Sequence, residues 1–130
     1  MIWQNVALSL AGIVGAGVAI FHGIAVQQRM VRPFKVAALA DGSFSGVIMR
    51  LIPPLLHFST VVWLLGGLAL IVAANGLEHD GRLAVSLLVG LTYLFGVIFN
   101  FWATRGRHPG WILLAVAIAL IVASSIRPGT

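Results

Sequence analysis

The sequence predicts an all-α fold, an integral membrane bundle of four antiparallel helices. Of its 130 residues, 60% are hydrophobic and only 8% are charged, whereas about 25% of residues are charged in an average soluble domain. So few charges cannot cover the surface of a soluble chain of this length, but lipid can cover an apolar surface. The apolar residues gather in four runs separated by short polar segments, which sets the number of helices.

The four apolar runs have the length that a transmembrane helix needs, although the last is short. They cover residues 6–26, 51–74, 83–102 and 111–126, within a single membrane domain 1–130. A helix needs about 20 apolar residues to cross the hydrocarbon core, and it satisfies its own backbone hydrogen bonds there. We expect Pro109 at the helix start, or the Arg127 side chain, to extend the reach of the last run.

The segment 27–50 is too long for a tight turn between two spans. Asp41-Gly42-Ser43 predicts a break, with Ser43 as the N-cap of a helix that leads towards Pro53-Pro54. Before the break we expect a short interfacial helix on the membrane surface, with Pro33 in its first turn. The two prolines should start the second span or kink it. The other two connections are short and predict antiparallel helical hairpins.

The basic residues predict the orientation of the bundle. Two connections, 27–50 and 103–110, hold six of the eight Lys and Arg residues, and the positive-inside rule places that side in the cytoplasm. Both chain ends then lie outside, with Arg82 and Arg127, and we expect a bacterial inner membrane. The six cytoplasmic cations are also predicted to bind anionic lipid headgroups. They are Arg29, Arg32, Lys35, Arg50, Arg105 and Arg107.

Polar side chains from three helices are predicted near the cytoplasmic end of the bundle. His22 lies four residues before the end of the first run and His57 six after the start of the second, which places both roughly 6–9 Å inside one leaflet. Asn100 lies in the same leaflet on the third run, and Tyr93 precedes it on the same helix stripe. Ionisable groups inside a membrane are costly and often mark function, so these four residues are the candidate cofactor-binding set.

Several interpretations of this set are open. His22 and His57 could ligate a haem iron from both faces, or with Asn100 they could hydrogen-bond a quinone carbonyl. With His108 they could hold zinc or copper, although no carboxylate lies in that part of the membrane. In the simplest interpretation each histidine is neutral and bonds a neighbouring helix. No catalytic residue is predicted, because the chain has no cysteine, no nucleophile–base pair and no nucleotide-binding loop.

Other polar residues give weaker patterns. The turn at 105–110 holds two arginines that suit phosphate oxygens, but headgroup contact and topology explain them too. His79 lies between Glu78 and Asp80 in an outer loop, which is a weak pattern for a metal site. The outer leaflet has few polar side chains beyond three serines, so a transport path across both leaflets is disfavoured. These are Ser9, Ser86 and Ser124.

Small residues recur at helical spacing and predict contact faces, because they let two backbones approach closely in lipid. The first run has a small residue at every fourth position, and the other runs have shorter sets. Each face can meet another helix of the same chain or a second copy, which makes a homo-oligomer one of the predictions. The members are Ala7, Ala11, Gly15, Ala19 and Gly23 with Gly12 and Ala16 alongside, then Gly66 and Gly67, then Ser86, Gly90 and Gly96, then Ala115, Ala119 and Ala123.

One stretch of the second run resembles a known membrane family. Residues 57–68, HFSTVVWLLGGL, are similar to the His…Trp…Gly-Gly-Leu helix of CopD-type copper-resistance membrane domains. The methionine- and histidine-rich copper patterns of that family do not accompany it. More broadly, the whole chain resembles small uncharacterised four-helix proteins of bacterial inner membranes, which implies a location.

These observations favour a membrane protein that acts through helix packing, as an accessory, scaffolding or oligomeric component and not as an enzyme by itself. The alternative is a haem- or quinone-binding electron-transfer protein that uses His22 and His57. A small transporter or channel ranks below both. The expected partners are anionic lipids and a second copy or larger membrane complex. Nucleic acid is not expected, because the cations occur only between apolar runs.

Overall fold

A computed structural model describes residues 2–126, and the regular structure of this part is entirely helical. The predicted all-α fold is therefore confirmed. Arg127, which we expected to extend the last span, lies outside the described residues. The elements in chain order are α1 (Ile2–Val26), the short π-helix η1 (Gln27–Val31), α2 (Arg32–Asp41), α3 (Gly46–Leu56), α4 (Phe58–Gly76), α5 (His79–Thr104) and α6 (Gly110–Ser125).

Three helical stretches are long and apolar enough to cross a membrane. α1, η1 and α2 join into one rod of 40 residues, Ile2–Asp41; α3 and α4 form a stretch of 31 residues; and α5 has 26. α6 is equally apolar but has only 16 residues. The predicted runs 6–26 and 83–102 lie within α1 and α5. The run 51–74 covers parts of α3 and α4, and the run 111–126 extends one residue beyond α6.

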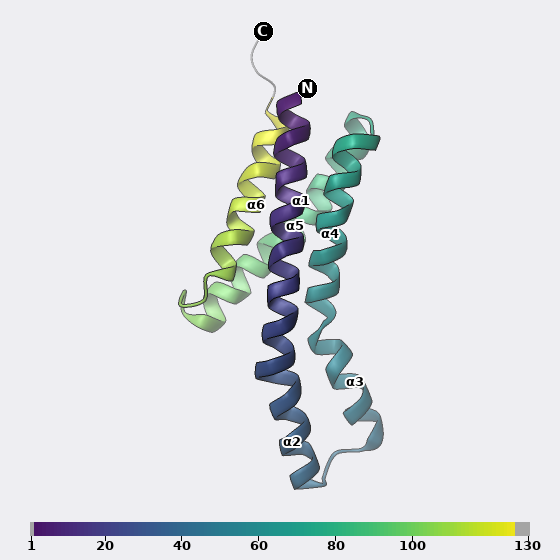
Figure 1. Cartoon of the computed structure of the whole chain (residues 1–130), viewed down its shortest axis with the longest axis vertical. Helices are drawn as coiled ribbons and strands as arrows, with labels where there is room; N and C mark the ends of the chain where they lie inside the picture. The colour runs from purple at the N-terminus through teal and green to yellow at the C-terminus, as the bar shows by residue number, and fades with distance from the viewer. Residues whose placement is uncertain (1, 127–130) are drawn as a thin grey trace.

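Helices α1, α4, α5 and α6 pack side by side as a bundle (Figure 1). α1 packs against α4 and α6, while α5 closes the bundle by packing against α4 and α6. In Figure 1, α5 runs obliquely behind the others, from beside α4 to the start of α6. The start of α1 and the end of α6 lie together, and the Gln4 side-chain N–H donates to the carbonyl of Ile126 at 3.4 Å.

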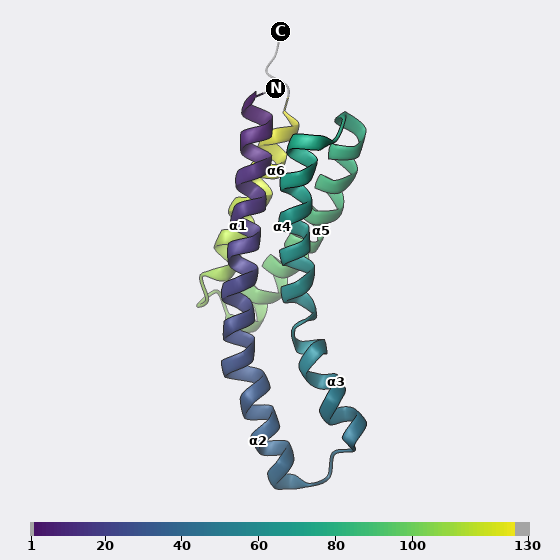
Figure 2. The same ribbon diagram turned by 45° about the vertical axis from the view of Figure 1, so that its right-hand side comes forward.

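Most of segment 27–50 is helical, and the helices expected before and after its break correspond to α2 and α3. α2 continues the direction of α1 beyond the bundle (Figure 2). The reason lies in η1, where the N–H of Arg32 bonds the carbonyl of Gln27 in a widened, five-residue turn. Such a turn inserts one residue without ending the helix, and Pro33 follows in the first turn of α2, where a missing N–H is tolerated.

The break between α2 and α3 lies where it was predicted, but the residue that caps the start of α3 is not the predicted one. Gly42 ends α2 in the left-handed conformation, with φ 66°, which glycine adopts without strain. The N-cap of α3 is Ser45, whose hydroxyl accepts a hydrogen bond from the N–H of Ile48 at 3.4 Å. Ser43, the predicted cap, donates instead to the Asp41 carboxylate.

The interruption predicted from Pro53-Pro54 occurs just after them, at His57. Neither proline has an N–H to donate, so this part of α3 lacks two helical hydrogen bonds. His57 ends α3 with an N–H bond to the carbonyl of Pro53 at 3.2 Å and begins α4 by accepting from Val61 at 3.1 Å. α3 therefore leaves α4 at an angle (Figure 2).

Direct backbone contact holds α1 against α4. A Cβ atom built on Gly12 would lie 2.5 Å from the carbonyl oxygen of Gly67, and one built on Gly67 would lie 2.6 Å from that of Gly12. Only glycine fits at either position. Two of the small residues thus face one another within the same chain, whereas Gly90 on α5 has open space beside it.

Tyr93 links α5 to both α4 and α1. Its side chain is fully buried, and its hydroxyl donates to the backbone carbonyl of Trp63 on α4 at 3.3 Å. The hydroxyl also lies against Gly15 on α1, where any Cβ atom would collide with it. Trp63 in turn covers Gly96 of α5, where a Cβ would lie 2.5 Å from its ring. The core therefore interlocks aromatic rings with glycines of neighbouring helices.

We expect Gly15→Ala to destabilise the protein by about 1–3 kcal/mol, the usual cost of forcing a methyl group into a filled core. The matched control is Gly17→Ala, because a Cβ at Gly17 meets nothing within 4 Å. It should be neutral or gain up to about 1 kcal/mol from the higher helix propensity of alanine. Far-UV circular dichroism during denaturation in detergent measures both. Equal stability of the two variants would contradict the contact between Tyr93 and α1.

Candidate functional site

The structure gives His22 and His57 separate partners. The Nε2 atom of His22 lies 3.1 Å from the hydroxyl of Ser59 on α4, and its ring packs on Trp63 with the ring centroids 4.7 Å apart. The Nε2 atom of His57 lies 3.0 Å from the side-chain oxygen of Gln27. Among the described residues no hydrogen bond or ring contact joins the two histidines. Each Nε2 thus faces its own polar neighbour, and the arrangement does not form a pair of facing iron ligands.

His22 and Asn100 do lie together, in the wall of a small cavity that His108 completes. The cavity measures about 10 Å³, close to the minimum for one water molecule. Asn100 donates to the carbonyl of Gly96 at 2.8 Å, and His108 Nδ1 accepts from the N–H of Gly110 at 3.1 Å. A porphyrin or quinone ring does not fit in this volume.

The remaining predicted site residues lie elsewhere. Tyr93 belongs to the core contact between α4, α5 and α1, and His57 lies at the α3–α4 junction. Within residues 2–126, no three His, Asp or Glu side chains are grouped closely enough to hold a metal ion. Of the four candidate cofactor-binding residues, the structure therefore brings together only two.

The six predicted headgroup-binding cations are all exposed. Three lie along η1 and α2, one lies on α3, and two lie in the turn before α6. Arg29 and His108 line one shallow cavity of about 200 Å³, so η1 and the turn at 105–109 are neighbours. Basic residues far apart in the sequence thus lie on one side of the molecule.

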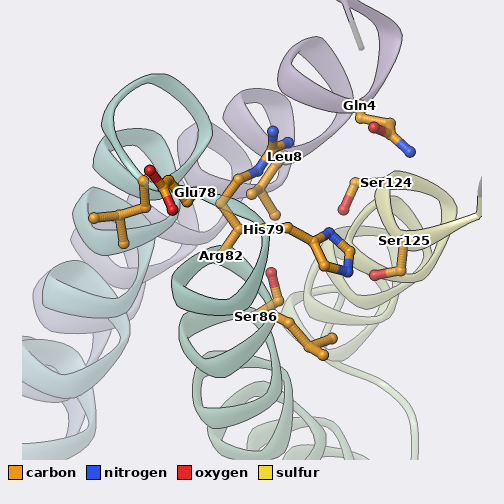
Figure 3. A pocket seen from close by; sticks show the side chains of 10 residues that line it. Gln4, Leu8, Glu78, His79, Arg82, Ser86, Ser124 and Ser125 are labelled. Atoms are coloured by element: carbon orange, nitrogen blue, oxygen red, sulfur yellow. The ribbon is translucent and has the colours of Figure 1, made fainter.

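A larger polar cavity, which the sequence analysis did not predict, lies at the other end of the bundle (Figure 3). Its volume is about 470 Å³. Residues of α1, α5 and α6 and of the α4–α5 connection line it. The polar members are Gln4, Glu78, His79, Arg82, Ser86, Ser124 and Ser125, and the apolar members are Leu8, Leu77 and Leu83.

Helix periodicity places the α5 contribution to this cavity. His79, Arg82 and Ser86 follow one another at spacings of three and four residues and therefore share one helix face. In Figure 3 the His79 ring points towards the serines of α6, and the guanidinium of Arg82 points towards α1. Sequence periodicity could have grouped these three residues. It could not have added Gln4 and Ser124, which come from near opposite ends of the chain.

No protein-family model, curated protein or solved structure matches this chain. The resemblance of residues 57–68 to CopD-type domains therefore remains a prediction.

We expect the His22–Ser59 hydrogen bond to stabilise the bundle by about 0.6 kcal/mol and by no more than about 1.7 kcal/mol, the range for such bonds between membrane helices. A double-mutant cycle with His22→Phe and Ser59→Ala measures it, because phenylalanine keeps a ring beside Trp63. The read-out is the free energy of unfolding in mixed micelles.

The control cycle combines His22→Phe with Ser125→Ala at the other end of the bundle. Its two effects should add to within about 0.5 kcal/mol, because distant sites rarely couple. A coupling energy of zero between His22 and Ser59 would show that their contact contributes nothing to stability.

Proposed function

We propose that the protein is an integral membrane protein whose four apolar helices cross the bilayer as an antiparallel bundle, forming one domain. We further propose that it acts through helix packing, as an accessory, scaffolding or oligomeric component. One observation carries the proposal: every helix of the bundle presents apolar side chains outwards. Leu65 on α4 and Leu91 on α5, for example, are 59% and 64% exposed. Soluble monomers rarely expose apolar patches larger than a few hundred Å², so lipid or other helices must cover this surface.

Contacts between α1 and α4 support the antiparallel arrangement. Asn75, near the end of α4, donates to the hydroxyl of Ser9, near the start of α1, at 3.5 Å. His22, near the end of α1, contacts Ser59, near the start of α4. Residue numbers therefore rise along one helix as they fall along its neighbour.

We propose that the basic side lies in the cytoplasm, as the positive-inside rule predicts, and that the membrane is a bacterial inner membrane. At 1.5 Å per residue, the 40-residue rod of α1, η1 and α2 is about 60 Å long, twice the roughly 30 Å of a hydrocarbon core. If α1 spans the core, Arg29, Arg32 and Lys35 lie at or beyond the headgroups. The arm formed by α2 and α3 then projects into the cytoplasm, and both chain ends lie outside.

A groove between α4 and α5 is the surface we propose for packing against another helix. Its volume is about 350 Å³, and its wall is almost entirely apolar. The lining includes Phe58, Val62, Leu88, Leu91 and Phe95.

The electron-transfer alternative has less support. Haem ligation by two histidines requires their ring nitrogens to face one metal, but those of His22 and His57 face Ser59 and Gln27. The cavity beside His22 and Asn100 holds no more than about one water. We therefore propose that these histidines are structural hydrogen-bonding residues.

The orientation is tested with single cysteines, since the natural chain has none. Ser43→Cys marks the turn between α2 and α3, and Asp80→Cys marks the start of α5; both positions are exposed. We expect a membrane-impermeant maleimide to label Asp80→Cys in intact spheroplasts and Ser43→Cys only after permeabilisation. The reverse pattern would overturn the orientation, and extraction of the protein by alkaline carbonate would overturn membrane insertion.

The packing role is tested by oxidative cross-linking in native membranes. Leu91→Cys lies in the α4–α5 groove, and Leu113→Cys, on the outer face of α6, is the control. We expect Leu91→Cys to form a disulfide-linked dimer if a second copy occupies the groove. A photo-cross-linker at the same position should give one discrete adduct if another membrane protein does. Absence of both products, or equal cross-linking at Leu113, would overturn packing through this groove.

A further inference from the structure

The cavity in Figure 3 contains a cation without a carboxylate partner. Arg82 is half-buried, and no ion pair forms among residues 2–126. Glu78 is one turn away, and its backbone carbonyl accepts the N–H of Arg82 at 2.9 Å. Its carboxylate, however, lies on the far side of Arg82 from the serines in Figure 3. A guanidinium never deprotonates in proteins and presents five donors, so its surroundings favour an anion.

Hydrogen-bond donors from three helices face the same space. Ser86 is only 5% exposed, lines the cavity, and makes no hydrogen bond to the described part of the chain. The buried side-chain atoms without a partner in the described part of the chain belong to Asn5 and Thr60, so the Ser86 hydroxyl is accessible from the cavity and free to donate. His79 on α5 and the second side-chain N–H of Gln4 on α1 add donors. Ser124 and Ser125 on α6 now bond the carbonyl of Ile121 at 2.7 and 3.2 Å.

The rest of the wall is apolar and reaches the outer surface of the bundle. Leu8 forms the buried part, being only 1% exposed, whereas Leu77 and Leu83 are 42% and 43% exposed. The volume of about 470 Å³ lies within the range of about 300–1,000 Å³ that is typical of small-molecule sites. The cavity thus has hydrogen-bond donors on its polar wall, and it opens through apolar residues beside the surface that we propose faces lipid.

We propose that this cavity binds the anionic head of an amphiphile, a carboxylate or phosphate group held by Arg82 and Ser86, with its apolar tail along Leu77 and Leu83. The amphiphilic character rests on the proposed membrane location, which places the cavity at the outer end of the bundle. A metal ion is not the occupant that these residues suit, because Glu78 is the only carboxylate in the wall.

The test uses the full chain, purified in an uncharged maltoside detergent, with dodecyl phosphate as the probe and calorimetry as the measurement. We expect saturable binding to the wild-type protein. Arg82→Gln should weaken it about tenfold or more, since hydrogen bonds to charged groups are the strong ones. Ser86→Ala should weaken it several-fold, and Arg82→Lys should retain part of it. Gln28→Ala, an exposed polar position at the other end of the bundle, should leave it unchanged.

Inorganic phosphate distinguishes the two sources of the anion. If it competes with dodecyl phosphate and depends on Arg82 in the same way, a free anion suffices; if only dodecyl phosphate binds, the tail is required and the source is the bilayer. Equal losses in Arg82→Gln and Gln28→Ala, or no saturable binding by protein that circular dichroism shows to be folded, would overturn the site. Because this titration is done in detergent, its failure leaves the cross-linking test of the packing role unaffected.

Discussion

The arrangement of the bundle depends on the backbone contact between Gly12 and Gly67. Once α1 and α4 are this close, the short polar side chains on their facing sides can reach across. His22 meets Ser59 at one end of the interface, and Asn75 meets Ser9 at the other. Longer side chains at the two glycines would separate the helices and break these contacts. In lipid, where no hydrophobic effect drives helices together, close packing of this kind is the main stabilising interaction.

The same tight packing determines where the bundle has space for a ligand. Tyr93 and Trp63 fill the space between α1, α4 and α5, so the interior beside the histidines is closed. α5, however, crosses the bundle obliquely, from beside α4 to the start of α6 (Figure 1). It therefore leaves a gap towards α6 near His79 and a groove along α4. Both open spaces follow from the direction of this one helix.

Much of the fold was predictable, because hydrophobicity, glycine and proline act locally. The four apolar runs, the break at Gly42 and the interruption after Pro53-Pro54 all depend on residues close in sequence. The separate partners of His22 and His57 were not predictable. Sequence position indicates how deep in the bundle a side chain lies, but it does not show how the helix is rotated or where a neighbouring helix is interrupted. The cavity beside His79 was missed for a related reason: its walls come from three helices, and no local sequence pattern predicts their contact.

The position of this cavity also links ligand binding to assembly. Gln4, Arg82 and Ser124 belong to α1, α5 and α6, and they lie together only when these helices are packed. A ligand that contacts all three binds the assembled bundle in preference to separated helices, and it stabilises that bundle by mass action. In the proposed membrane location α6 gains most from such a ligand, because its 16 residues give it the shortest apolar length of the four bundle helices. An anionic amphiphile at this site would thus hold α6, the shortest helix of the bundle, at the end where the start of α1 meets the end of α6.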